Sequence, residues 1–343
     1  MKKVGLTLGK FAPLHKGHQY MIETALREVD EMLVMIYDTS VTDVPLSVRA
    51  GWIRKLYPAV KVIECWDGPE GYSNERDFEI LQEKYILSAL NGQRVTHFYS
   101  SEFYGGHVSK ALGAADRRVD EARGAVPVSA TMIRADPFLY REFISDTVYP
   151  DLIAKIVFVG AMSTGKSTIT EALAEKFNTT FAGEYGRDYW AEHQVNRRIS
   201  LEAFNEIAVG HIEREDKAVL SADKYLFVDT NAITTYQYAL DYHGGAPALL
   251  ARLALENAQR YDLFFLCGDD MPYDDTWDRS GDQKRKVFQK QVIADLKNRR
   301  IPYIPLAGDL RQRIAIVEAV LSQFTKYGNY FGQAANLNAP RPY

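Results

Sequence analysis

Eight residues near the middle of the chain have the types and spacing of a loop that binds phosphate. They follow a short apolar run at 155–159, precede a segment with helical periodicity, and read Gly160-Ala161-Met162-Ser163-Thr164-Gly165-Lys166-Ser167. In this context the loop turns successive amide N–H groups toward a polyphosphate, aided by the positive end of the helix dipole. Lys166 is expected to reach the β- and γ-phosphates, and the Ser167 hydroxyl to ligate Mg²⁺. The alternative is an ordinary strand-to-helix turn rich in small residues, and both flanks favour nucleotide binding over it.

An acidic residue and a polar segment further along the chain fit the same chemistry. Asp229 lies at the end of a strand predicted over 224–230, where it would face the phosphate loop and either hold Mg²⁺ or accept a proton from a substrate hydroxyl. The alternative is that Asp229 only caps the next helix. The segment 270–285 lacks periodicity, and its cations Arg279 and Arg285 predict a mobile lid that closes over a transferring phosphoryl group. A solvated run of charges is the alternative, and charge alone does not separate the two.

Two histidines, His15 and His18, form a second reactive group near the start of the chain. They stand three residues apart where a strand predicted over 4–8 passes into a helix, so both rings lie on one side of the first helical turn. Free N–H groups at a helix start favour an anion, and Gly9 and Gly17 let the backbone approach a ligand closely. A His-x-x-His metal pair is the alternative, but no third Cys, His or acidic ligand stands at a supporting spacing.

Residues 9–18 resemble the signature Gly-x-Phe-x-Pro-x-His-x-Gly-His of the nucleotidyltransferase superfamily, which moves a nucleotidyl group from a nucleoside triphosphate to a phosphate or similar acceptor. The second signature of that superfamily, Ile-Ser-Ser-Thr-x-Ile-Arg, is similar to residues 128–134, where Ala130 replaces one Ser. The resemblance implies that the two histidines donate hydrogen bonds to the ATP phosphates and that Arg134 and Lys10 neutralise charge at the α-phosphorus. Positioning and oriented positive charge can lower this barrier without a covalent nucleophile. The ATP-binding residues implied in this half are Gly9, Lys10, Phe11, His15, His18, Ser129, Thr131 and Arg134.

The blocks at 42–49 and 100–105 resemble a narrower group, the adenylyltransferase half of the bifunctional NadR-type proteins. These proteins join nicotinamide mononucleotide adenylyltransferase to ribosylnicotinamide kinase. The resemblance implies substrate binding by Arg49, Trp52 and Trp66, with the two indoles as candidates for stacking on a nicotinamide ring. Burial in the core is the alternative fate of each Trp.

The second half of the chain is similar to the kinase part of the same family at 184–187, 229–231 and 278–280. Two positions depart from the family pattern: Asn231 stands where Asp is usual, and Gly183 where an aromatic residue often stands. Tyr185 and Tyr242 are therefore the candidates to contact the nicotinamide ring. The substrate-binding residues implied here are Glu184, Tyr185, Arg187, Asp229, Asn231 and Tyr242. The residues expected to bind ATP are Gly160, Ser163, Thr164, Gly165, Lys166, Ser167, Thr168, Arg279 and Arg285. The expected catalytic residues of the two halves are His15, His18, Arg134, Lys166, Asp229 and Arg279.

The elements that must position these groups alternate between strand and helix, which predicts an α/β protein. We expect an N-terminal Rossmann-like nucleotidyltransferase domain at 1–150 and a C-terminal P-loop kinase domain at 151–327, both with parallel sheets flanked by helices, followed by a tail at 328–343. The predicted strands are 4–8, 31–37, 60–66, 95–100, 155–159, 180–182, 224–230, 262–266 and 301–306. The helices predicted with explicit bounds are 46–57, 75–90, 138–144 and 200–220, the last capped by Ser200.

Length and composition restrict the class of protein. The chain has 343 residues, a formal net charge of −4 and 46% hydrophobic residues, which is ordinary for a soluble globular protein of two domains. It has no basic excess for nucleic acid or an anionic membrane, and no apolar stretch long enough to span a bilayer. Cys65 and Cys267 lie in strand-like runs far apart, which predicts buried reduced thiols and, without a secretion signal, a cytoplasmic protein.

Together these features predict a bifunctional NAD⁺ salvage enzyme that uses ATP and Mg²⁺. One half would phosphorylate nicotinamide riboside to nicotinamide mononucleotide, and the other would join that product to AMP from a second ATP, giving NAD⁺ and pyrophosphate. Many family members carry an N-terminal helix-turn-helix for which this sequence leaves no room, so no operator binding is expected. The alternatives are the same two chemistries on another nucleoside and phosphorylated acceptor, and a non-catalytic ATP-sensing module. The sequence leaves the oligomeric state open, with a homo-oligomer among the alternatives.

Overall fold

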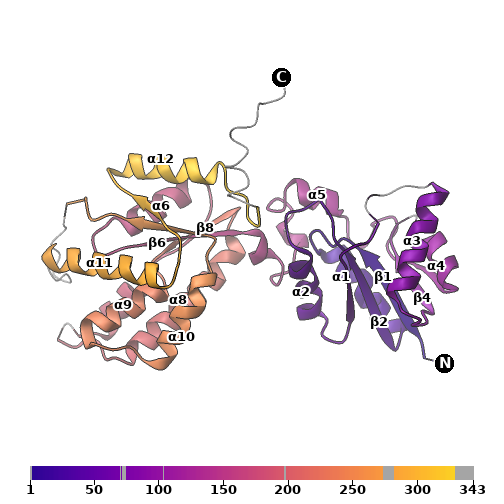
Figure 1. Ribbon diagram of the computed structural model, residues 1–343, viewed down its shortest axis with the longest axis horizontal. Coiled ribbons are helices and arrows are strands. Elements are labelled where there is room, and N and C mark those ends of the chain that lie inside the picture. The colour runs from indigo at the N-terminus through magenta and orange to yellow at the C-terminus, as the bar shows by residue number, and fades with distance from the viewer. Residues whose placement is uncertain are drawn as a thin grey trace, which may run out of the picture. The chain divides into compact units, whose positions relative to one another are not determined.

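The computed structural model of the chain describes residues 2–69, 71, 75–102, 104–196, 198–272 and 282–328. The chain divides into two compact units, Met1–Pro150 and a second that begins at Asp151. Each unit contains a five-stranded sheet whose neighbouring strands run parallel, and helices cover both faces of each sheet (Figure 1). The prediction of two parallel sheets flanked by helices is therefore confirmed.

In the first unit the strand order is β3-β2-β1-β4-β5, so the order reverses at β1. In open α/β sheets, ligands bind beyond the carboxyl ends of the strands at such a reversal, and residues 9–18 begin where β1 ends. The strands are β1 Val4–Gly9, β2 Glu31–Tyr37, β3 Lys61–Cys65, β4 His97–Ser100 and β5 Ala115–Arg118. The helices are α1 Lys16–Glu28, α2 Leu46–Leu56, α3 Arg76–Ala89, α4 Gly105–Leu112 and α5 Ala130–Ala135.

The first sheet is buried on both faces at β2, because this strand is apolar at six consecutive positions. Residues 32–37 of β2 are all buried. Alternate side chains of β1 and β2, among them Leu6 and Leu33, pack with Ile86 of α3 and Val108 of α4. Burying such a side chain contributes roughly 1.5–3 kcal/mol, and this packing fixes the carboxyl ends of β1 and β2 side by side.

In the second unit the strand order is β10-β9-β6-β8-β7, which places β6, the strand before the phosphate loop, in the centre. The strands are β6 Ala154–Val159, β7 Phe181–Ala182, β8 Tyr225–Asp229, β9 Leu263–Cys267 and β10 Ile304–Leu306. The helices are α6 Lys166–Lys176, α7 Tyr185–His193, α8 Ala203–Ala218, α9 Ala232–His243, α10 Ala248–Glu256, α11 Asp282–Asn298 and α12 Leu310–Leu321.

Helices α6 and α12 cover one face of this sheet, and α8, α9, α10 and α11 lie on the other (Figure 1). On the α6 side, Phe158 of β6 stacks against Phe265 of β9 with ring centroids 5.6 Å apart and lies 6.3 Å from the ring of Phe227 on β8. This row of rings locks the three central strands together below the phosphate loop.

Two predicted helices differ from the structure for local reasons. The segment 138–144 forms only a short 3₁₀ turn, Arg141–Phe143, because the Asp136 carboxylate accepts hydrogen bonds from the backbone N–H groups of Phe138 (3.0 Å) and Leu139 (2.9 Å). The helix predicted over 200–220 begins at Ala203, since Ser200 caps a turn by accepting from Ala203 N at 3.2 Å. Helices α4, α5, α7, α10 and α11 and strand β5 have no counterpart among the predicted elements, and α11 begins inside the segment 270–285 predicted to be a lid.

Both cysteines are buried free thiols, as predicted. Among the described residues, no helix is both long enough and apolar enough to cross a membrane.

Candidate active sites

His15 and His18 build the start of α1. His15 is the N-cap residue, its Nδ1 accepts a hydrogen bond from Gly17 N at 3.1 Å, and the backbone N–H of His15 points at Nδ1 of His18 at 3.4 Å. This is a capping box made of two imidazoles, and the rings stack 3.7 Å apart. Because each Nδ1 accepts, each ring carries its proton on Nε2, and that N–H remains as a donor.

Both imidazoles are held in their neutral form. Burial, together with the nearby positive charges of Arg123 and Arg134, lowers the pKa of His15 to about 4. Burial, the neighbouring His15 and Arg134 hold the pKa of His18 well below its ordinary value. At neutral pH the pair therefore offers two uncharged Nε2–H donors rather than two cations.

Acidification is expected to destabilise the first unit through His15. The unfolded chain binds a proton near pH 6.5 while the folded chain resists protonation until about pH 4, so stability falls as the pH falls through that range. The difference corresponds to roughly 3 kcal/mol. Calorimetry at pH 7 and pH 5 should show a smaller loss in His15→Asn, because Asn caps a helix equally well but does not titrate. An equal loss in both proteins would contradict this assignment.

The second signature contacts the first through Arg134. Ser129 is the N-cap of α5 and accepts from Met132 N at 3.2 Å. From that short helix, Arg134 donates to the backbone oxygen of Ala12 at 3.1 Å and to Thr131 Oγ1 at 3.0 Å. A direct hydrogen bond between Arg134 and Ala12, which are 122 residues apart in sequence, therefore joins the segments 9–18 and 128–134.

A cavity of about 400 Å³ opens beside these segments at the carboxyl ends of β1 and β2. Gly9 and Lys10 line it, while Phe11 is buried and its ring meets the ring of His18 edge-on at 4.9 Å. The remaining lining comes from Leu8, Tyr37, Asp38, Thr39, Ser40, Val41, Pro69, Gly71 and Gln82.

The phosphate loop of the second unit has the backbone that its glycines permit. Gly160 and Gly165 adopt φ values of 142° and 80°. A Cβ at Gly160 would lie 2.7 Å from the backbone oxygen of Cys267, so only glycine fits there. Inside the loop, the backbone oxygen of Ala161 accepts hydrogen bonds from Thr164 Oγ1 (2.7 Å) and from Lys166 Nζ (2.9 Å).

Three buried side chains support this loop from behind. Gln289 accepts from Ala161 N at 2.7 Å and donates to Cys267 O at 2.9 Å, which ties the loop to the end of β9. Arg313 donates to Thr164 O at 2.6 Å. Arg285 donates to the backbone oxygens of Ser163 (3.3 Å) and Met271 (3.0 Å).

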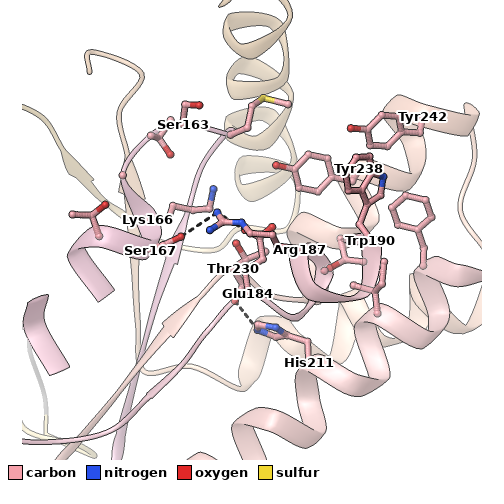
Figure 2. A pocket seen from close by; sticks show the side chains of 18 of the residues that line it. Ser163, Lys166, Ser167, Glu184, Arg187, Trp190, His211, Thr230, Tyr238 and Tyr242 are labelled. Atoms are coloured by element: carbon pink, nitrogen blue, oxygen red, sulfur yellow. Dashed lines mark hydrogen bonds and ion pairs between the residues drawn. The ribbon is translucent and has the colours of Figure 1, made fainter. Parts of the chain in front are cut away.

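Two carboxylates lie at the ends of neighbouring strands opposite the loop. Asp229 ends β8 and is buried, and Glu184 follows β7. Burial and the nearby charge of Asp229 raise the pKa of Glu184. Arg187 lies between this acid and the loop, 3.3 Å from Glu184 Oε2 and 3.3 Å from Ser167 Oγ (Figure 2).

A cavity of about 380 Å³ joins Glu184, Arg187 and the phosphate loop to an aromatic wall formed by Trp190, Phe204, Tyr238 and Tyr242. Asp229 is not among the described residues that line it. Figure 2 shows three of these rings, those of Trp190, Tyr238 and Tyr242, grouped on one side of the pocket and Lys166, Ser167 and Arg187 on the other. The pocket can therefore hold a ligand that is planar at one end and polar or charged at the other.

Comparisons with known proteins show the family of this chain. A family model described as an AAA domain matches residues 155–313. The chain is 31% identical over 323 residues to the trifunctional NAD biosynthesis/regulator protein NadR of Salmonella typhimurium, covering 88% of this chain and 78% of that protein. The chain belongs to the NadR family. The protein of the same description from Escherichia coli is 30% identical over the same share of each chain.

Two solved NadR structures share the fold of this NadR-family chain. The crystal structure of NadR protein in complex with NAD and AMP-PNP is 22% identical, with a TM-score of 0.57 over 94% of this chain and 96% of that one. The crystal structure of NadR protein in complex with NR is 22% identical with a TM-score of 0.56 and the same coverage.

Three predicted site residues of this NadR-family chain are placed differently from the prediction. Trp52 is 1% exposed and belongs to the core, so its indole cannot stack on a ligand. Arg49 is also fully buried, and its guanidinium donates to the backbone oxygens of Lys10, Tyr37 and Val44. It supports the carboxyl ends of β1 and β2 rather than lining the cavity. Arg285 is not on a lid: it lies inside α11, 3% exposed, on the carbonyl side of the phosphate loop.

Two further positions in the second unit need correction. Tyr185 faces α8, where its ring packs on Gly210 and under Arg214 at 4.7 Å, and it does not line the cavity. Asn231 is fully buried, its Oδ1 caps α9 by accepting from Thr234 N at 3.1 Å, and it is not among the described residues that line the cavity. Trp66 is exposed and stays a prediction, and Arg279 lies outside the described residues.

Sequence reasoning missed Trp190, Tyr238 and His211, which all line the second cavity. A signal for His211 was present: His211 and Glu215 continue the buried face of α8 set by Phe204, Ile207 and Ala208. Polar residues at buried helical positions need partners, and that need marks them for attention.

Proposed function

We propose that the chain is a bifunctional NAD⁺ salvage enzyme. The second unit phosphorylates nicotinamide riboside with ATP, and the first unit then transfers AMP from a second ATP to the mononucleotide, releasing pyrophosphate. The observation that carries the proposal is that each unit of one NadR-family chain has its own set of groups suited to phosphate, the imidazole pair with Arg134 in the first and the phosphate loop in the second. The naming of NAD, AMP-PNP and NR as ligands of NadR structures supports the same substrates here.

In the phosphorylation step, the riboside 5′-oxygen attacks the γ-phosphorus and ADP leaves. Glu184 accepts the hydroxyl proton, because it lines the cavity and its pKa is raised by burial and by the nearby charge of Asp229. Lys166 and Arg187 supply positive charge where charge develops on the phosphoryl oxygens.

The donor set of this site fits Mg²⁺. Ser167, at the start of α6, and Asp229, at the end of β8, would offer oxygen ligands. This agrees with Mg²⁺, which typically binds one or two protein oxygens together with substrate phosphates. When bound there it would neutralise charge on the phosphates.

In the adenylyl-transfer step, the mononucleotide phosphate attacks the α-phosphorus of ATP. The Nε2–H groups of His15 and His18 donate to the phosphates, and Arg134 adds the positive charge that the neutral histidines lack. The cavity lined by Gly9 and Lys10 is the candidate to receive substrate in this unit, although neither histidine nor Arg134 is among its described lining residues.

The aromatic wall accounts for selection of the nicotinamide ring, and Trp190→Ala tests it. We expect the KM for riboside to rise roughly tenfold, since an aromatic stack is worth about 0.5–1.5 kcal/mol beyond area burial. The KM for ATP should change little, because the indole is grouped with the other rings away from Lys166 and Ser167 (Figure 2). Trp66→Ala, an exposed Trp in the other unit, is the matched control. An unchanged KM for riboside in Trp190→Ala would show that the aromatic wall does not bind the riboside.

Liquid chromatography of the reaction products tests the proposal as a whole. Riboside with MgATP should yield mononucleotide and then NAD⁺, and supplied mononucleotide should yield NAD⁺ directly. A panel of other nucleosides and phosphorylated acceptors runs beside them. Preference for another nucleoside and acceptor would show that the proposed substrates are wrong. ATP binding without turnover on any of them would show that the protein is not an enzyme of this kind.

A further inference from the structure

One histidine in the second unit contacts the backbone next to both carboxylates, although it lies outside the sequence segments that contain them. His211 lies on α8, is 2% exposed and lines the cavity. Its Nε2 is 3.0 Å from the backbone oxygen of Thr230, the residue after Asp229. Its Nδ1 accepts from the backbone N–H of Tyr185, the residue after Glu184, at 3.5 Å. A single ring thus contacts the backbone that follows each acid, and Figure 2 shows His211 beside Thr230 and Glu184.

A buried network fixes the orientation of this ring. His211 Nε2 also lies 3.2 Å from Oε1 of Glu215, which is fully buried. Burial opposes a charge on Glu215, but the hydrogen bond from His211 and the charge of Arg260, whose Nε is 2.6 Å from Oε2, outweigh it and lower the pKa of Glu215. Tyr261 OH donates to the same carboxylate at 2.5 Å. Held by a carboxylate, the ring keeps its proton on Nε2 and leaves Nδ1 as the acceptor.

The backbone that His211 holds on the Asp229 side is strained. Thr230 has φ of 71°, a region that costs a β-branched residue on the order of 1–3 kcal/mol. Such a conformation persists only where surrounding contacts fix it. In this conformation Thr230 Oγ1 donates to Asp229 Oδ1 at 3.2 Å, so the strained residue orients the carboxylate.

We propose that His211 is a positioning residue for phosphoryl transfer: by joining Thr230 to Tyr185 it sets the separation of Asp229 and Glu184. The inference rests on the proposed kinase function of this site. His211 acts through the backbone and needs no contact with the substrate.

Two substitutions test the two backbone hydrogen bonds of His211 separately. The amide nitrogen of His211→Gln can take the place of Nε2 and donate to Thr230, whereas the oxygen of His211→Asn replaces only the Nδ1 acceptor. We expect kcat for riboside phosphorylation to fall roughly 10- to 100-fold in His211→Asn and less in His211→Gln, since the Thr230 bond is the shorter one. The KM values for riboside and ATP should stay within about threefold, because binding groups are untouched.

Tyr261→Phe is the matched control. It also removes one hydrogen bond to the buried Glu215, but Tyr261 is not among the described residues that line the cavity. A purely structural role predicts equal losses of kcat in Tyr261→Phe and His211→Asn, and that result would overturn the inference. So would wild-type kcat in His211→Asn.

A crystal structure of His211→Asn separates this inference from the proposed function. We expect Thr230 to leave the left-handed region and the Asp229–Glu184 separation to change. An unaltered backbone would overturn the positioning role, whatever the substrate. Failure of the wild-type protein to phosphorylate any riboside would overturn the proposed function instead, and the crystallographic result would still decide the role of His211.

Discussion

Replacing Lys166 with alanine is expected to abolish riboside phosphorylation and to leave adenylyl transfer to supplied mononucleotide intact. Lys166 is buried, and its ammonium lies within the phosphate loop at 2.9 Å from Ala161 O. Its removal deletes the positive charge aimed at the transferring phosphoryl group, a loss on the order of 10²- to 10³-fold in kcat. Separate assays with riboside and with mononucleotide, each resolved by chromatography, measure the two steps.

Lys176→Ala is the matched control for this experiment. Lys176 ends the same helix, is exposed and pairs with Glu318 at 2.9 Å on the surface. Its substitution should change neither step, because exposed ion pairs contribute little. Loss of both steps in Lys166→Ala when mononucleotide is supplied directly would show that the division into two sites is wrong.

Replacing His18 with alanine is expected to produce the opposite pattern. Adenylyl transfer should fall by roughly 10²- to 10³-fold, because a neutral Nε2–H donor directed at the phosphates is lost, while riboside phosphorylation continues. Part of the loss could arise from the helix start, since His18 Nδ1 faces the backbone N–H of His15. His18→Gln restores that cap, because Gln at this position completes a capping box. Because the Gln amide also supplies an N–H donor, the melting temperature of each variant is measured beside its activity. A loss of activity in His18→Ala without a loss of stability assigns the effect to the donor rather than to the cap.

His107→Gln serves as the control for loss of a histidine in the first unit. His107 pairs with Glu83 at 3.2 Å, away from residues 9–18. It should keep both activities. Unimpaired NAD⁺ formation by His18→Ala would show that the imidazole pair takes no part in adenylyl transfer.

The sequence predicts those parts of the sites that depend on short-range geometry. The hydrogen bonds of the phosphate loop join Ala161 to Thr164 and Lys166, three and five residues away. The imidazole capping box joins His15 to His18, three residues away. Helix periodicity and glycine conformation settle contacts over such distances, so residue spacing is sufficient information.

The aromatic wall depends on tertiary packing and is not visible in the sequence. Trp190 and Tyr238 come from α7 and α9, which the sheet order brings together. A Trp in an amphipathic segment has the same sequence pattern whether it faces a ligand or the core. Trp52 faces the core.

Arg285 shows how composition misleads near a site. A cation in a polar segment suggests a lid, yet in this fold the side chain is buried and satisfies the carbonyl groups of Ser163 and Met271. Carbonyl groups turn away from a loop whose N–H groups face phosphate, and buried carbonyls need donors. The arginine therefore supports the cradle from the side opposite the ligand.

The uncharged state of His15 and His18 has a consequence for how the first unit attracts its substrates. Interactions between exposed charges weaken as ionic strength rises, whereas short hydrogen bonds from neutral donors in a partly dry environment are little affected. If these rings bind the triphosphate as proposed, the direction of their Nε2–H groups determines recognition more than net charge does. In the proposed adenylyl transfer, pyrophosphate would meet two neutral groups rather than two cations, which would favour its release and the next turnover.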